Sequence, residues 1–340
     1  MGVNLRSLVP KTKVDFKTLS GKIVAIDAYN ALYQFLAIIR QPDGTPLTDR
    51  SGKITSHLSG LFYRTANLVE SRIRPIYAFD GKPHLLKSRT LEMRQNRKVI
   101  AEKEWKEALE AGDLKRAKSK AQQTSRVTKD ILKQSKQLLE ALGIPYIQAP
   151  SEGEAQASYL VKKGEAFAVG SQDYDCLLVG SPVLIRNLTS SQRRKLPGKE
   201  AYSKVYPNQI RLKQNLKSLG LNQKQLVDMA ILIGTDFNEG IKGIGPKKSL
   251  NLIKKNGNVE NVLATIGNKD APTFEEIKEI RKIFLNPEVT DDYSIEWTEP
   301  DNEKVIKILV DNHQFTLERV EPILEKFSSI KNMMKQKTLF

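Results

Sequence analysis

The stretch that decides the fold is PSEGEAQASYL at residues 150–160, followed by AFAVGSQDYDCLLVG at residues 166–180. It places four carboxylates on two neighbouring elements: Glu152, Glu154, Asp173 and Asp175. The first two stand where a helix should begin, because a proline and a serine precede them and an alanine-rich run follows. The second two follow an apolar run and lie two residues apart, so on extended chain their side chains should share one face. Such a cluster repels itself unless a cation fills it, and the hard divalent ions Mg²⁺ and Mn²⁺ prefer oxygen ligands.

Each acidic pair also has an ordinary structural explanation. Ser151 and Glu154 have the spacing of a capping box, in which the glutamate only reaches back to a backbone donor. Acidic residues in a first helical turn are common because of the helix dipole. Asp173-x-Asp175 alone is a frequent turn motif. Carboxylates from other parts of the chain are therefore needed to indicate a metal site.

The N-terminal part supplies such carboxylates in a repeated pattern. KIVAID at 22–27 is an apolar strand that ends in Asp27, and a helix at 28–39 follows. After a loop at 41–53 and a helix at about 55–70, which Thr55 or Ser56 should cap, the strand at 74–81 ends in Asp80. Strands that alternate with helices predict a parallel sheet with crossover connections. Ligands bind beyond the carboxyl ends of such strands.

Asp27, Asp80 and Asp173 all fall at that edge of the expected sheet. Asp27 alone fits a helix N-cap equally well, and Asp80 with Gly81 fits a turn. Three separate strands that end in an acid are a stronger signal than one. The sequence therefore predicts an α/β fold, with a mostly parallel central sheet flanked by helices and an acidic site at its edge.

The composition indicates a polyanionic partner. The chain has 340 residues, a net charge of +16 and a pI of about 9.6, which favours nucleic acid over an acidic membrane surface or a mere solubility effect. No apolar run approaches the length of a membrane span and the N-terminus lacks a secretory pattern, so an intracellular protein without membrane contact is expected. The single cysteine, Cys176, excludes an internal disulfide, and we interpret it as a small buried residue rather than a nucleophile.

Two further segments have the features of nucleic-acid contacts. Residues 86–125 hold eleven Lys and Arg against six Asp and Glu, and should form one or two exposed helices broken near Gly112. We interpret them as an arch that contacts phosphates, although a solvated helical face has the same composition. GIKGIGPKKSLNLIKK at 240–255 places glycines before a helix N-terminus, where backbone N–H groups can meet a phosphate. This is a helix-hairpin-helix signal, and a simple helical corner is the alternative.

The other expected elements complete an alternating α/β chain. A regular amphipathic helix is expected at 128–142, short strands at 144–149 and 183–188, and a basic exposed loop at 190–201. A helix at 221–234 should be capped by Asn222, and the α-rich remainder should close the core with a helix at 311–327. We expect a single domain at 1–335, made of an N-terminal region at 1–100, the arch at 86–126, and an internal region at 127–260 with its hairpin at about 230–255.

Six strings, in their order and spacing, resemble the flap endonucleases of the structure-specific 5′ nuclease family, in their archaeal form. They are IDAYNALYQFL, TSHLSGLFYRT, FDGKPHLLKS, PSEGEAQASYL, GSQDYDCLL and GTDFNEGIKGIGPKK, and the resemblance runs from Met1 to about Lys335. It implies a 5′ nuclease fold related to PIN domains, with a helical arch and a helix-hairpin-helix element. It also implies cutting of DNA at single-strand/duplex junctions during replication and repair, with 5′-3′ exonuclease activity as a further expectation.

The resemblance assigns roles to individual residues. It implies a two-metal site with Mg²⁺, for which Mn²⁺ is a substitute, held by Asp27, Asp80, Glu152, Glu154, Asp173, Asp175 and Asp236. Asp236 enters this set only through the resemblance. Lys87 and Arg94 would act on the scissile phosphate as catalytic cations, and Tyr33 would stack on a base, although core packing is its ordinary alternative. The implied DNA contacts are Gly2, after removal of Met1, and the hairpin residues Gly243, Gly245, Lys247 and Lys248, where K⁺ would also bind.

The resemblance also implies partners and leaves rivals. The partners are branched DNA with a 5′ flap and a sliding clamp of the PCNA type, which the C-terminal residues Gln336, Leu339 and Phe340 fit only as a shortened motif. A monomer is expected, in the cytoplasm or nucleoid of a prokaryote or the nucleus of a eukaryote. A PIN-type RNA nuclease would lack the long arch and the glycine hairpin. A non-catalytic junction binder would keep DNA binding without metal-dependent cutting.

Overall fold

The computed structural model describes residues 2–190, 193–195, 202–267 and 271–327. A seven-stranded sheet lies at its centre, in the order β1-β9-β6-β5-β2-β3-β4. The strands are β1 (Thr12–Lys13), β2 (Ile23–Asp27), β3 (Arg74–Phe79), β4 (Tyr146–Gln148), β5 (Ala168–Gly170), β6 (Val183–Arg186) and β9 (Asn208–Arg211). The five strands from β6 to β4 are parallel to their neighbours, whereas β9 pairs antiparallel with both β6 and β1. The predicted mostly parallel sheet is confirmed, and the antiparallel edge was not foreseen.

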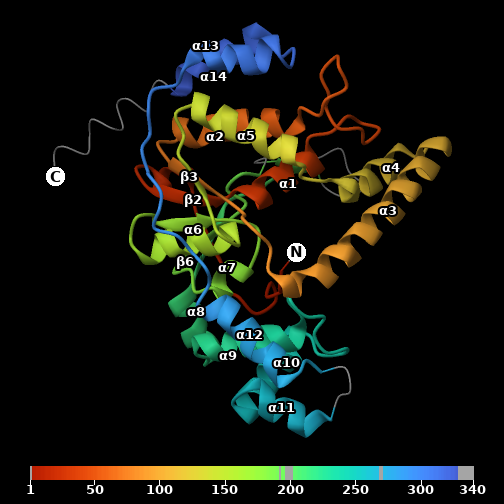
Figure 1. Cartoon of the computed structure of the whole chain (residues 1–340), viewed down its shortest axis with the longest axis vertical. Helices are drawn as coiled ribbons and strands as arrows, with labels where there is room; N and C mark the ends of the chain where they lie inside the picture. The colour runs from red at the N-terminus through yellow and green to blue at the C-terminus, as the bar shows by residue number, and fades with distance from the viewer. Residues whose placement is uncertain (1, 191–192, 196–201, 268–270, 328–340) are drawn as a thin grey trace, which may run out of the picture.

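Helices cover both faces of the sheet, as Figure 1 shows. Their bounds are η1 (Phe16–Leu19), α1 (Ala28–Ile38), α2 (Ser56–Glu70), α5 (Lys129–Ala141), α6 (Gly153–Lys162) and α7 (Asp175–Leu178). α2 and α5 pack together on one face, and α6 packs under β2, β3 and β5 on the other. Strands β2 and β3 are almost wholly buried, and after Arg74 at the start of β3 their residues are apolar up to Asp27, which ends β2, and Asp80, which follows β3.

The predicted arch is present as two helices that project from the sheet edge (Figure 1). It consists of η2 (Leu85–Lys87), α3 (Ser88–Glu110), α4 (Leu114–Ala121) and η3 (Gln122–Thr124). The helices break at Gly112, which has a φ of +70°, as the sequence predicted. The indole N–H of Trp105 donates to the carbonyl of Asp43 at 3.1 Å, so the far part of the arch leans on the loop after α1.

A helical unit lies below the sheet in Figure 1 and contains the glycine hairpin. Its elements are α8 (Leu212–Leu219), α9 (Gln223–Ile233), α10 (Pro246–Asn256), α11 (Val259–Ile266) and α12 (Phe274–Leu285). Asn222 caps α9 in a capping box with Gln225, as expected for Asn222. Arg281 of α12 bonds to the fully buried Asp228 of α9 and to Glu260 of α11, so one guanidinium joins three helices.

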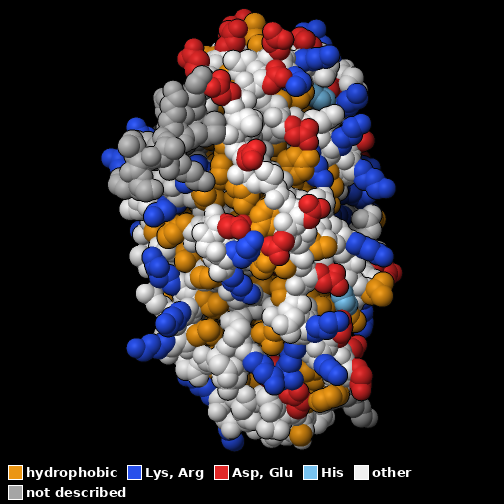
Figure 2. Space-filling model, turned by 60° about the vertical axis from the view of Figure 1, so that its left-hand side comes forward, with side chains coloured by type: hydrophobic (Ala, Val, Ile, Leu, Met, Phe, Trp, Pro, Cys, Tyr) orange, Lys and Arg blue, Asp and Glu red, His pale blue; other side chains and the backbone are white. Residues whose placement is uncertain are grey.

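An extended strap at residues 286–301 runs from α12 to the C-terminal helices α13 (Asn302–Ile306), η4 (Lys307–Asp311) and α14 (Leu317–Phe327). The side-chain amide of Gln156 pairs with both backbone groups of Thr290 at 2.9 Å. The indole of Trp297 donates to the carbonyl of Pro75 at 3.0 Å, and the amide of Thr298 donates to Gly143 at 3.0 Å. On the face in Figure 2, acidic side chains gather at the upper end, where Figure 1 places α13 and α14.

Several local predictions are wrong in detail. Thr55 precedes α2, but its side chain makes no capping bond. Residues 190–201 are not simply a loop, because β7 (Arg193–Lys195) pairs with β8 (Tyr202–Lys204). The expected helix at 311–327 begins only at Leu317, since a π-helical turn ends at Asp311. Among the described residues no helix is long and apolar enough to cross a membrane.

Candidate active site

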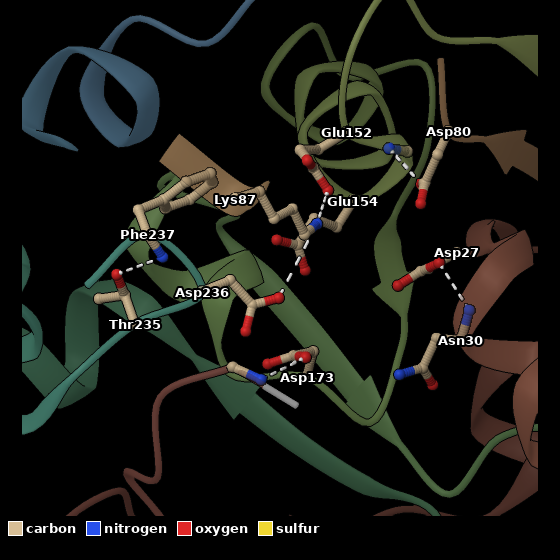
Figure 3. A network of polar contacts seen from close by, with 12 residues as sticks. Asp27, Asn30, Asp80, Lys87, Glu152, Glu154, Asp173, Thr235, Asp236 and Phe237 are labelled. Carbon is tan, nitrogen blue, oxygen red and sulfur yellow. Dashed lines mark hydrogen bonds and ion pairs between the residues drawn. The ribbon is translucent and has the colours of Figure 1, made fainter. Parts of the chain in front are cut away.

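All seven predicted acids lie at or next to the edge of the sheet where the parallel strands end. β2 ends at Asp27, Asp80 follows β3, and Asp173 follows β5. The other four come from the N-terminal turns of two helices and from the loop after α9: Glu152, Glu154, Asp175 and Asp236. Figure 3 shows six of these side chains around one space, with Lys87 directed into it from the base of the arch.

Asp27 and Asp80 are held by backbone donors at the ends of neighbouring strands. Asp27 caps α1, where it accepts from the Asn30 amide at 3.0 Å, and it also accepts from the Ser171 hydroxyl at 3.1 Å. Asp80 accepts from the Gly153 amide at 2.7 Å. Burial, opposed in part by these bonds and reinforced by nearby carboxylates, raises the pKa of Asp27 to about 6 and that of Asp80 to about 8. The N-cap explanation of Asp27 is thus correct, but it does not account for the surrounding charge.

Glu152 and Glu154 do not form the capping box that was their ordinary explanation. The N-cap of α6 is Glu152, which makes no side-chain capping bond. Burial raises the pKa of Glu154 well above its ordinary value, and the charges of Asp175 and Asp173 raise it further. Cys176 is fully buried with its Sγ 4.0 Å from Glu154, and burial raises the pKa of its thiol, so it is the small core residue expected.

Asp173 and Asp175 are not on extended chain, which corrects the sequence prediction. β5 ends at Gly170 and α7 begins at Asp175, so the pair occupies a turn in which Asp173 accepts from the Asp175 amide at 3.3 Å. Each carboxylate also accepts a bond from the chain's N-terminal segment. The Gly2 amide donates to Asp173 at 2.9 Å and the Val3 amide donates to Asp175 at 2.7 Å. The ordinary turn explanation is therefore correct in part, and burial still raises the pKa of Asp175.

Two cations of the arch lie on the acids. Lys87 Nζ is 2.5 Å from Glu152 Oε2 and 3.8 Å from Asp236 Oδ2, and Arg94 donates to Asp236. Burial alone would lower the pKa of Lys87, but Glu152 and Asp236 raise it overall. Burial likewise opposes ionisation of Asp236, yet nearby positive charges, Arg94 and Lys87 among them, lower its pKa. Asp236 thus lies between the two cations of the arch, and Lys87 also joins it to Glu152.

The chemistry of the cluster fits metal ions, although the carboxylates are not drawn together as ligands. Within the described ranges no three His, Cys, Asp or Glu side chains are close enough to hold an ion. Amide donors and the two arch cations occupy the oxygens instead. Burial and mutual repulsion raise the pKa of Asp27, Asp80, Glu154 and Asp175, a penalty that a divalent cation would relieve. The donor set is all oxygen, as Mg²⁺ and Mn²⁺ prefer.

The other predicted DNA-binding residues lie outside the acid cluster. Tyr33 on α1 is 39% exposed with Lys98 of the arch above its ring, so it is not simply a core residue. In the hairpin, Gly245 is the N-cap of α10 and Pro246 is its first residue, as predicted. An added Cβ at Gly243 or Gly245 would meet nothing within 4 Å, so this backbone faces open space. Lys247 and Lys248 are exposed in the first turn of α10.

Some features of the site were beyond sequence reasoning. The contacts of Gly2 and Val3 join residues more than 170 positions from their partners, and no local pattern indicates them. Asp236 follows a helix rather than a strand, so the strand-end pattern missed it and only the resemblance found it. The proposed clamp-binding residues Gln336, Leu339 and Phe340 lie outside the described residues.

Comparisons with known proteins identify the family. Residues 1–101 match the XPG N-terminal domain and residues 143–236 match the XPG I-region. Flap endonuclease 1 of Aeropyrum pernix is 52% identical over 332 residues, which cover 96% of this chain and 94% of that protein.

Solved structures agree with this result. The flap endonuclease-1 from Methanococcus jannaschii superposes with a TM-score of 0.77 at 43% identity, covering 99% of this chain and 100% of that one. The catalytic core of Rad2 in complex with a DNA substrate superposes with a TM-score of 0.69 at 25% identity, covering 93% and 96% of the two chains. The predicted fold and family are confirmed, and the chain belongs to the flap endonucleases, which are DNA-binding nucleases.

Proposed function

We propose that this flap endonuclease hydrolyses one phosphodiester at the base of a single-stranded 5′ flap, in a reaction that depends on Mg²⁺. The observation that carries the proposal is the position of Lys87 and Arg94. Both belong to the arch, and both contact acids of the cluster: Lys87 contacts Glu152 (Figure 3) and Arg94 contacts Asp236. A site that combines buried carboxylates with converging cations suits metal ions and a phosphate together.

We assign the seven acids to two metal ions. Asp27, Asp80, Glu152 and Glu154 would hold one Mg²⁺, and Asp173, Asp175 and Asp236 would hold the other, in part through water. When bound, the ions supply an activated water and a counter-charge for the leaving oxygen. Mn²⁺ has the same oxygen preference and would replace Mg²⁺.

The cations of the chain have their own part in the reaction. The oxygen of a water attacks phosphorus, and the bond from phosphorus to the 3′ oxygen breaks, which leaves a 5′-phosphate and a 3′-hydroxyl. Lys87 and Arg94, released from Glu152 and Asp236, neutralise charge that grows on the phosphoryl oxygens. Because both lie at the base of α3, they reach the phosphate only when the flap passes the arch.

Substrate choice then follows from shape rather than base identity. The open backbone at Gly243 and Gly245, with Lys247 and Lys248, would hold one duplex through its phosphates, and K⁺ would bind the same turn through carbonyl oxygens. Tyr33, exposed beside the arch, would stack on the base next to the cut. Gly2 lies against Asp173 and would approach the same junction.

The reaction would remove 5′ flaps from branched DNA. Because such flaps form during replication and repair, we propose that the enzyme acts in these processes. The C-terminal Gln336, Leu339 and Phe340 would bind a PCNA-type sliding clamp, and we propose that the enzyme works as a monomer in the compartment that holds DNA. Exonuclease cutting from a 5′ end would use the same site.

The decisive experiment is cleavage of an end-labelled duplex with a 5′ flap, beside a linear duplex, a 3′ flap and an RNA strand. Each is incubated with Mg²⁺ and with chelator. We expect cutting at the base of the 5′ flap only, and only with metal. Asp175→Ala should abolish cutting while junction binding survives, since this carboxylate belongs to the cluster and not to the hairpin.

Asp301→Ala is the matched control, because the half-exposed Asp301 carboxylate caps α13 and bonds to the amide and the ammonium of Lys304 rather than to the cluster. It should cut as the unchanged protein does. Equal cutting of RNA and linear DNA would contradict the flap specificity. Tight junction binding without any cutting would contradict the catalytic role of the cluster.

A further inference from the structure

We propose that His84 is a positioning residue. Its imidazole holds the turn that carries Lys87 in a fixed position relative to the loop that carries Asp236. This inference rests on the proposed role of Lys87 in cleavage. His84 lies three residues before Lys87 and contacts neither an acid of the cluster nor, in the proposed mechanism, the DNA. It acts through the geometry of its neighbours.

One side of the ring holds the turn before the arch. His84 is the N-cap of η2, and its Nδ1 accepts from the Leu86 amide at 3.2 Å. Its carbonyl accepts from the Lys87 amide at 3.0 Å, which closes the same turn. Because a backbone N–H can only donate, Nδ1 is the unprotonated nitrogen and the ring proton is on Nε2. The imidazole therefore fixes the backbone from which the Lys87 side chain departs.

The other side of the ring faces the helical unit below the sheet. Nε2 lies 3.3 Å from Glu279 Oε1 on α12, an acceptor for the proton that Nε2 carries. The ring also meets the ring of Phe237 edge to face, with centroids 6.2 Å apart and planes at 87°. Phe237 directly follows Asp236 and packs in turn on Phe284 of α12 at 5.4 Å. One side chain thus joins the base of the arch to the loop of a site acid.

The position of Lys87 gives these contacts a catalytic consequence. Its ammonium lies 2.5 Å from Glu152 and 3.8 Å from Asp236, so a small rotation of η2 would move it from one carboxylate towards the other. Displacements of about 1 Å can lower a rate as much as 100-fold when a group must meet the transition state. The alternative is an ordinary cap, whose loss would lower stability and leave the chemical step unchanged.

The test compares His84→Ala with His84→Asn under single-turnover conditions, with enzyme in excess over a 5′-flap duplex. We expect His84→Ala to lower the cleavage rate about 10-fold and to change the Kd for the flap DNA by less than about twofold, because the interaction is needed only for the chemical step. Asparagine is a good N-cap and its carbonyl oxygen can replace Nδ1. It has no ring to meet Phe237 and Glu279, however, so His84→Asn should restore the turn and recover only part of the rate.

The same change in a Lys87→Ala background shows whether His84 acts through Lys87. There, His84→Ala should have no further effect on the rate, since coupled residues are not additive. Glu239→Ala is the control, because Glu239 forms an exposed 3.0 Å ion pair with Arg89 between the same two parts of the molecule. It should leave the rate unchanged.

The outcomes separate the two proposals. If Lys87→Ala alone leaves the rate unchanged, the proposed role of Lys87 fails. If Lys87→Ala slows cleavage but His84→Ala lowers only the melting temperature, His84 is a cap and the inference is wrong. An equal loss from His84→Ala with and without Lys87 would also overturn it, as would full recovery of the rate by His84→Asn, because a cap alone would then be sufficient.

Discussion

The backbone amide of Gly2 donates a hydrogen bond to Asp173 Oδ2 across 2.9 Å, so the N-terminal segment lies on the acid cluster. A Cβ at residue 2 would lie 2.2 Å from the carboxylate atoms of Asp175, closer than any side chain can approach. The N-terminal segment is therefore a wall of the site, and its fit depends on glycine.

Gly2→Ala should consequently damage the site rather than the fold. The methyl group must push away either the N-terminal segment or Asp175, and we expect single-turnover cleavage of a 5′ flap to fall about 100-fold. The melting temperature should change little, because the buried side chains of Val3 and Leu5 still hold this segment in the core. Ser7→Ala, at an exposed residue of the same segment, is the control and should cut normally. Normal cutting by Gly2→Ala would show that the segment has moved aside.

Asp80 should make the metal-free protein less stable as the pH rises. Its folded pKa of about 8 lies above its ordinary 3.8, so the folded state holds the proton more tightly than the unfolded state between these values. The stabilisation that protonated Asp80 contributes is fully present below about pH 4 and is lost progressively as the pH rises to about 8. Asp80→Asn keeps an acceptor for the Gly153 amide and removes the charge. In chelator, it should raise the melting temperature at pH 8 and not at pH 4.

Asp301→Asn should change the melting temperature at pH 8 in the opposite direction to Asp80→Asn. The hydrogen bonds and charge of Lys304 lower the pKa of Asp301, so its ionised form is the one that favours folding. Removing that charge should give a slightly lower melting temperature at pH 8. A rise with Asp301→Asn as large as that with Asp80→Asn would mean that net charge, and not the buried cluster, causes the effect.

The lysines of the hairpin should govern salt dependence. Lys247 and Lys248 are exposed in the first turn of α10, and each would neutralise about one phosphate of the DNA. Changing either to alanine should weaken flap DNA binding at every base sequence and reduce the slope of log K against log salt by about 1. The cleavage rate at saturating enzyme should stay the same. The slope is measured by fluorescence anisotropy. An unchanged slope would show that the hairpin lysines do not contact the DNA.

Arg281 should stabilise the hairpin unit rather than the chemistry. Its guanidinium bonds to both oxygens of the buried Asp228, at 2.6 and 2.8 Å, and to Glu260 at 2.7 Å. Arg281→Met would leave Asp228 buried without its cation, which should lower the free energy of unfolding by about 3–5 kcal/mol. Adding Asp228→Asn should recover part of the loss in a denaturant titration. Lys304→Ala, which breaks only an exposed pair, should lower the stability far less than Arg281→Met does.

The acids at the strand ends could be predicted because each directly follows an apolar run in the sequence. β2 and β3 are buried on both faces, so their apolar runs stop abruptly at Asp27 and Asp80, and the parallel arrangement brings those ends together. The turn at Asp173 was misjudged as extended chain, since a residue spacing of two does not distinguish a strand from the start of a short helix.

The contacts that could not be predicted join distant parts of the chain. β1 has two residues and pairs with β9 almost 200 positions away, which leaves no periodic signal. His84 shows the same limit, because its partners Glu279 and Phe237 are fixed by how the helical unit meets the sheet. The strap at 286–301 has no regular structure, so its order depends on side chains such as Gln156 and Trp297.

That strap has a consequence for how the enzyme withstands proteases. Between α12 and α13 it is held at separate places by Gln156, by Pro75 and by Gly143, each through a backbone or amide bond. A single peptide cut between Thr290 and Trp297 would therefore leave both new ends anchored to the sheet layer. We expect the nicked protein to stay together as one particle under native conditions and to separate into two fragments only in denaturant.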